Sequence, residues 1–77
     1  MLPLFLNTEN KICLVVGGGA VASRKVSVLR QCGVSIRLVS PVVNKNLQAM
    51  IDKGEVEYRA ERFSTSDLTG VDLVIVN

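Results

Sequence analysis

The chain has 77 residues and therefore room for one domain at most. Its hydrophobic content of 48% excludes a disordered chain, while its few aromatic residues and its net charge of +2 argue against a nucleic-acid-binding surface. No apolar run approaches the roughly 20 residues of a membrane-spanning helix, and the opening residues lack a signal-peptide pattern. We therefore expect a cytoplasmic protein whose partners include neither nucleic acid nor a membrane.

The first predicted elements are a strand and a helix that three glycines separate. Residues 11–16 are a short apolar run, which predicts a fully buried strand. Residues 20–32 carry apolar side chains at helical spacing, and Gly33 stands where a left-handed C-terminal cap belongs. The predicted apolar face of this helix consists of Val21, Ala22, Val26, Val28, Leu29 and Cys32.

A second strand and a second helix follow. Residues 34–39 predict a strand, which Pro41 prevents from continuing in a central position. Residues 43–53 predict a helix, with Asn44 as its N-cap and Gly54 after its end. The sequence thus repeats the pattern of strand and helix.

The last predicted elements complete an α/β pattern. Residues 55–59 alternate in a way that is typical of a strand near an edge, and Ser64 or Ser66 caps one helical turn. Residues 72–76 predict another fully buried strand. Strands that alternate with helices favour a parallel sheet with right-handed crossovers. We expect the Rossmann-like strand order 3-2-1-4, the first part of an NAD(P)-binding domain that fills residues 1–77 and is truncated at its C-terminal end.

The glycines of the first junction have the spacing of a dinucleotide-binding loop. The pattern Gly17-x-Gly19-x-x-Ala22 follows a predicted strand and opens a predicted helix, which is the context that this fingerprint requires. Gly17 would permit a tight turn, Gly19 a close approach of backbone to pyrophosphate, and Ala22 close packing of helix on strand. The alternative is a glycine turn that serves only the fold. A Walker loop is excluded, because no Gly-Lys-Ser/Thr follows.

The second predicted strand ends without the acidic residue that usually binds the ribose. Ser40 and Pro41 stand at that position, and no Asp or Glu lies between Glu9 and Asp52. A serine hydroxyl could bond to a ribose hydroxyl, and it could equally tolerate a 2′-phosphate. The residues by themselves therefore leave both NAD and NADP open.

Two cations and two cysteines need an interpretation. Arg24 and Lys25 lie in the first turns of a helix, where they oppose its dipole. They form either an ordinary solvated surface or a basic rim for an anion, such as a cofactor phosphate or a polycarboxylate substrate.

We interpret Cys13 and Cys32 as small buried hydrophobic side chains. The chain has no histidine, and no metal site is predicted.

Four segments of the chain stand out together: Leu2-Pro3-Leu4-Phe5, the triple glycine 17–19, Ala22-x-Arg24-Lys25 and Ser40-Pro41. With these segments, the chain resembles the N-terminal domain of siroheme synthases. This is the precorrin-2 dehydrogenase family, which often also has sirohydrochlorin ferrochelatase activity. The resemblance covers essentially the whole chain. It implies NAD-dependent oxidation of the tetrapyrrole precorrin-2 to sirohydrochlorin in siroheme biosynthesis, iron insertion in many members, and a homodimer.

The resemblance also implies which residues bind the cofactor. By matching position, they are Gly17, Gly19, Ala20, Val21, Ser40, Pro41 and Val42. The catalytic aspartate of the family lies beyond the last residue here, so no catalytic residue is assigned. Asp67 and Asp72 are not substitutes, because the first belongs to a helical turn and the second begins a strand at the wrong end of the sheet.

Two further expectations concern the whole protein. The chain is either a fragment that is inactive alone, or its last strand is paired in an oligomer. A non-catalytic nucleotide-sensing module is the alternative function, and another NAD(P)-dependent dehydrogenase is a third. Formation of sirohydrochlorin by the full-length protein would separate them.

Overall fold

The sheet is built around its first strand. A computed structural model of the chain describes residues 10–77, so the opening Leu2-Pro3-Leu4-Phe5 lies outside the described residues. The elements, in chain order, are β1 (Ile12–Val16), α1 (Ala20–Gln31), β2 (Ser35–Val39), α2 (Lys45–Asp52), β3 (Glu57–Arg59), the 3-10 helix η1 (Thr65–Leu68) and β4 (Leu73–Val76). All strands are parallel and stand in the order β3-β2-β1-β4. This confirms the predicted Rossmann-like α/β fold and its strand order.

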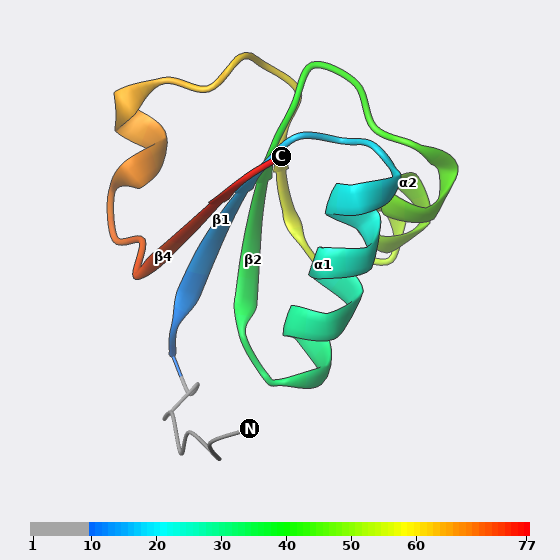
Figure 1. Cartoon of the computed structure of the whole chain (residues 1–77), viewed down its shortest axis with the longest axis horizontal. Helices are drawn as coiled ribbons and strands as arrows, with labels where there is room; N and C mark the ends of the chain where they lie inside the picture. The colour runs from blue at the N-terminus through cyan, green and yellow to red at the C-terminus, as the bar shows by residue number, and fades with distance from the viewer. Residues whose placement is uncertain (1–9) are drawn as a thin grey trace.

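The connections lie on opposite faces of the sheet. Helices α1 and α2 cover one face, and η1 covers the other on the way from β3 to β4 (Figure 1). The main core lies under α1 and α2. Its buried members are Cys13, Val15, Ala22, Val26, Ile36, Leu38, Leu47 and Val56. Leu14 and Val39 are fully buried and point to the η1 face, because side chains alternate along a strand.

The predicted helix caps are confirmed, although α2 begins at Lys45 rather than at residue 43. Asn44 caps α2, since its Oδ1 accepts a hydrogen bond from the Leu47 amide at 2.9 Å. Gly33 follows α1 with a φ of +83°, and Gly54 follows α2 with a φ of +72°. Both values lie in the left-handed region that glycine adopts without strain. These short signals therefore determine where each helix stops.

The Asn44 cap gives a first testable prediction. Replacing Asn44 by alanine removes the acceptor for the Leu47 amide and should lower the free energy of unfolding by about 1 kcal/mol. Urea denaturation measures this change. Asn46 is exposed in the first turn of the same helix, so Asn46→Ala is the matched control and should change stability by less than about 0.5 kcal/mol. Equal effects of the two substitutions would contradict the assignment of the cap.

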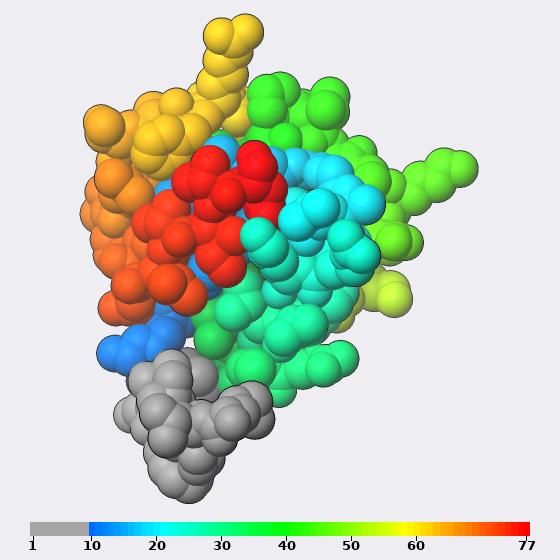
Figure 2. Space-filling model, in the orientation of Figure 1, coloured from blue at the N-terminus to red at the C-terminus, as the bar shows by residue number. Residues whose placement is uncertain are grey.

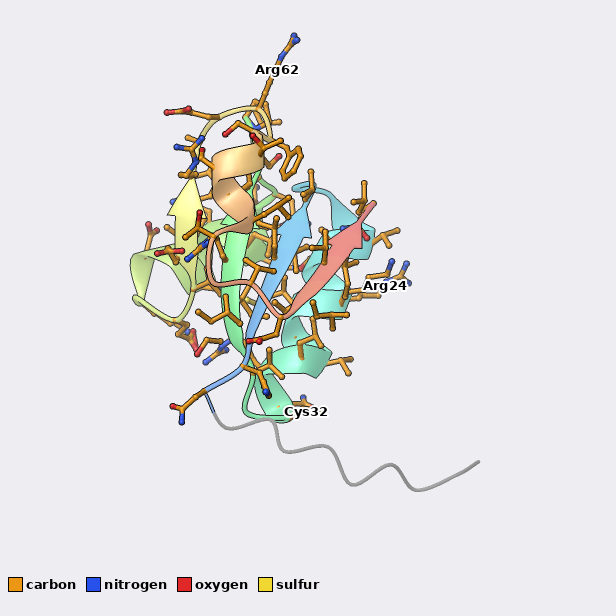
Figure 3. All side chains as sticks on the ribbon, turned by 90° about the vertical axis from the view of Figure 1, so that its left-hand side faces the viewer. Arg24, Cys32 and Arg62 are labelled. Carbon is orange, nitrogen blue, oxygen red and sulfur yellow. The ribbon has the colours of Figure 1, made fainter. Side chains whose placement is uncertain are left out.

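The predicted apolar face of α1 is too wide. Ala22 and Val26 are buried as expected, but Val21 and Val28 are exposed, Val28 to 60%. Cys32 is also exposed, so the prediction that both cysteines are buried is wrong for Cys32. This residue lies at the C-terminal end of α1 (Figure 3). The sheet packs against one side of the helix only, so it buries the narrow stripe that contains Ala22 and Val26 and leaves the flanking side chains exposed.

Cys13 behaves as predicted. It is fully buried in β1, and this burial raises the pKa of its thiol. A raised pKa keeps the thiol neutral, and the neutral form is the unreactive one. Cys13 is therefore a small hydrophobic core residue.

The prediction of a fully buried last strand is wrong for the residues that the structure describes. In β4, Leu73, Val74 and Val76 are exposed, Val76 to 72%, and only Ile75 is half-buried against the core. The reason is position: β4 pairs with β1 on one side, and no strand within residues 10–77 pairs with its other side. Figure 2 shows β4 at the surface beside α1. No helix in residues 10–77 is long and apolar enough to cross a membrane.

A polar cluster ties η1 to its face of the sheet. Arg37 in β2 pairs with Glu57 at 2.5 Å and donates to the carbonyl oxygens of Asp67 and Thr69 at 2.8 and 2.7 Å. Asp67 is 3% exposed, and its carboxylate lies 2.7 Å from Nε of Arg59. The buried carboxylate therefore has one charged partner, Arg59, and its other oxygen accepts a hydrogen bond from the Ser64 amide.

Candidate functional site

Two loops meet at the carboxyl edge of the sheet. Val16 lies opposite Val39 in the parallel pair of β1 and β2, so residues 17–19 and 40–42 leave the sheet side by side (Figure 1). Ligands of open parallel sheets bind outside this edge, at the strand from which connections run to both sides. Here that strand is β1, because β2 and β4 flank it. All seven residues predicted to bind the cofactor lie in these two loops or in the first turn of α1.

Gly17 makes the tight turn that the sequence predicts. Its φ is +123°, and its amide donates to the carbonyl oxygen of Val39 at 3.1 Å. A Cβ at this position would lie 3.2 Å from Cβ of Asn77, whose amide and side-chain Nδ2 both donate to the carbonyl oxygen of Val16. The backbone conformation therefore favours glycine here, and the contact with Asn77 leaves little space for a side chain.

Gly18 has a packing role that the spacing of the glycine fingerprint does not predict. A Cβ on it would overlap the carbonyl oxygen of Val42 and lie 2.8 Å from Oγ of Ser40. Its own carbonyl oxygen accepts a hydrogen bond from the Asn44 amide at 2.8 Å. Gly18 is thus the point where the two loops touch. The one sequence signal for this role is that the chain has a glycine between Gly17 and Gly19, at a position where the fingerprint accepts any residue.

Gly19 differs from its two neighbours. Its φ of −93° suits any residue, and a Cβ on it would meet nothing within 4 Å. Nothing among the described residues therefore explains why a glycine stands there. Gly19 is the N-cap of α1, no side chain caps that end, and the first turn contains no acidic residue. This helix end thus has no side-chain cap and is open on the Cβ side of Gly19, and uncapped N-terminal amides suit an anionic group.

Ser40 is turned into its own loop. The residue is 6% exposed, and its Oγ donates to the carbonyl oxygen of Val42 at 2.6 Å. Its carbonyl oxygen accepts from the Tyr58 hydroxyl at 2.9 Å. Pro41 and Val42 are exposed and form the outer surface of the loop. The hydroxyl of Ser40 therefore shapes the loop, while its two successors face outward.

Arg24 and Lys25 lie beside β4. Both are exposed, and with Val28, Leu29 and Ile75 they line a shallow apolar groove between α1 and that strand. The Arg24 side chain extends away from the sheet (Figure 3). The structure thus places the two cations along α1 rather than in the glycine loop.

The two aspartates excluded from catalysis have structural contacts. The Asp72 carboxylate accepts a hydrogen bond from the Ile12 amide at 2.9 Å, at the amino ends of β1 and β4. Asp67 lies in η1, where its carboxylate accepts from the Ser64 amide at 2.8 Å, so Ser64 is the cap of this turn. Asp72 therefore lies at the edge of the sheet opposite the glycine loop, as expected.

Comparison with known proteins places the whole described fold in one family. Residues 4–77 match the family described as "Putative NAD(P)-binding". Siroheme synthases of Nitrosococcus oceani and Methylobacillus flagellatus are 43% and 42% identical to the chain over 74 residues, which is 96% of the chain. The chain spans 16% of the length of these relatives. A solved structure of "SirC, precorrin-2 dehydrogenase" matches all of the chain and 39% of its own length, with a TM-score of 0.88 and 28% identity.

Proposed function

The chain belongs to the family of NAD(P)-binding domains that residues 4–77 match, and we propose that it is the cofactor-binding part of an NAD-dependent precorrin-2 dehydrogenase of siroheme biosynthesis. The observation that carries this proposal is the open, uncapped helix end at Gly19. That glycine has no structural reason within residues 10–77, whereas a bound pyrophosphate would supply one. The likeness to siroheme synthases and to SirC supports the choice of reaction.

The proposed site has two halves. Gly17, Gly19, Ala20 and Val21 would hold the pyrophosphate through backbone amides at the start of α1. Pro41 and Val42 would flank the adenosine ribose with their exposed surfaces, and Ser40 would support them from behind. Residues 40–43 include no cationic side chain for a 2′-phosphate, which supports NAD over NADP.

The proposed chemistry divides between cofactor and protein. The cofactor, when bound, would supply the hydride acceptor. The residues described here would bind the cofactor and hold it at the carboxyl edge of the sheet, and none of them is proposed as a catalytic acid or base. Precorrin-2 as substrate, ferrochelatase activity, a homodimer and a cytoplasmic location are proposals for the whole protein that rest on the family resemblance.

The proposal is tested with the full-length protein. Precorrin-2 and NAD should give NADH, detected by absorbance, and sirohydrochlorin, detected by mass, with NADP a poorer acceptor. The control reaction omits the tetrapyrrole. Tight NAD binding without any turnover of precorrin-2 would instead identify a nucleotide-sensing module. Absence of binding to both cofactors would refute the nucleotide site itself.

A further inference from the structure

Tyr58 connects the edge strand β3 to the loop that follows β2. Its ring is half-buried against the core under α1 and α2, and it lies opposite Leu38 in the sheet. Its hydroxyl reaches toward the carboxyl edge and donates to the carbonyl oxygen of Ser40 at 2.9 Å. Tyr58 belongs to neither of the two loops, so the fingerprint of the sequence does not point to it.

Ser40 is held from the side of β3 and in turn holds Val42. The Ser40 amide donates to the carbonyl oxygen of Arg59 at 3.1 Å, and the Ser40 carbonyl oxygen accepts from Tyr58. The Ser40 hydroxyl then donates to the carbonyl oxygen of Val42 at 2.6 Å. Every polar group of this residue therefore has a partner. The Tyr58 hydroxyl is the partner of the Ser40 carbonyl oxygen, which directly precedes Pro41.

Val42 transmits this arrangement to the glycine loop. Its carbonyl oxygen occupies the space that a Cβ of Gly18 would need, and the Asn44 amide donates to the carbonyl oxygen of Gly18 at 2.8 Å. The loops 17–19 and 40–42 consequently hold one another in place. A binding site whose two halves are fixed before the ligand arrives avoids the free-energy cost of ordering them.

We propose that Tyr58 is a positioning residue of the dinucleotide site. Through Ser40 and Val42, its hydroxyl sets the position of the ribose loop relative to the pyrophosphate loop. The part of this inference that concerns affinity rests on the proposed nucleotide site. The part that concerns the loops does not, because it follows from contacts within the chain.

The test removes only the hydroxyl, as Tyr58→Phe in the full-length protein. Because the Ser40 carbonyl loses its partner, the Kd for NAD should rise about fivefold, which is the effect of one ordinary hydrogen bond. Hydrogen exchange of the Asn44 amide, which bridges the two loops, should accelerate by a similar factor. Exchange of the Val15 amide in the buried strand β1 should stay unchanged.

Val56→Ala is the matched control. Val56 belongs to the same core and lies just before β3, away from the Ser40 contacts. The Val56→Ala substitution should lower the melting temperature at least as much as Tyr58→Phe does. It should leave the NAD affinity and the exchange rate of the Asn44 amide unchanged, because a general loss of stability does not move the two loops.

Each outcome decides one claim. Unchanged Asn44 exchange in Tyr58→Phe would overturn the positioning role, whatever the NAD affinity. Faster exchange with unchanged NAD affinity would show that the hydroxyl orders the loops without serving the cofactor, which also overturns the proposal. Failure of the unaltered protein to bind NAD would overturn the proposed function, while the exchange experiment would still decide whether Tyr58 fixes the loops.

Discussion

Replacing Gly18 by alanine is expected to lower the free energy of unfolding by about 3 kcal/mol, near the upper end of what overpacking usually costs. The added Cβ would overlap the carbonyl oxygen of Val42 and crowd Oγ of Ser40 at 2.8 Å. Neither neighbour can withdraw freely, because one is backbone and the other is hydrogen-bonded within its loop. Chemical denaturation, followed by circular dichroism, measures the loss.

Gly19→Ala is the matched control for this experiment. It adds the same methyl group to the next residue, where a Cβ meets nothing within 4 Å and the φ of −93° is ordinary. Its effect on stability should be below about 0.5 kcal/mol. If Gly18→Ala proved as stable as Gly19→Ala, the contact between the two loops would have to be abandoned.

Replacing Gly19 by aspartate is expected to leave the fold intact and to weaken NAD binding at least tenfold, or about 1.4 kcal/mol. An aspartate is a favoured N-cap, and its charge suits the N-terminus of α1, so folding should not suffer. The same carboxylate would occupy the open space at this helix end and repel a pyrophosphate. Circular dichroism reports the fold, and calorimetric titration with NAD and NADP reports affinity.

Asparagine at the same position separates charge from size. Gly19→Asn has nearly the shape of the aspartate and caps a helix as well, but it carries no charge. Its affinity for NAD should lie between those of the unaltered protein and Gly19→Asp, since only steric exclusion acts. A folded Gly19→Asp protein with unaltered affinity for both cofactors would mean that the glycine loop is only a structural turn.

Features that depend on a few neighbouring residues were predictable from the sequence. Asn44, Gly33 and Gly54 mark helix ends through local hydrogen bonds or a positive φ, and the structure has them in these roles. The parallel sheet and its order were predictable for a different reason: strands alternate with helices, and right-handed crossovers leave few alternative orders.

Contacts between individual residues that are distant in the sequence were not predictable. The contact of Gly18 with Val42 exists only because β1 and β2 pair in one register, which brings their following loops together. Burial of β4 was predicted from its apolar composition, but composition does not say which strands pair with it, and within residues 10–77 only β1 does.

The way Arg37 holds η1 has a consequence for how this segment can evolve. Its guanidinium donates to the carbonyl oxygens of Asp67 and Thr69, which every residue type offers equally. The exposed positions Thr65 and Leu68 can therefore diverge without loosening the crossover. Arg37 itself has no such freedom, because a lysine lacks the planar fork that spans two carbonyls and a carboxylate at once. Among related proteins, we expect sequence variation at the exposed positions of η1 and an unchanged arginine at position 37.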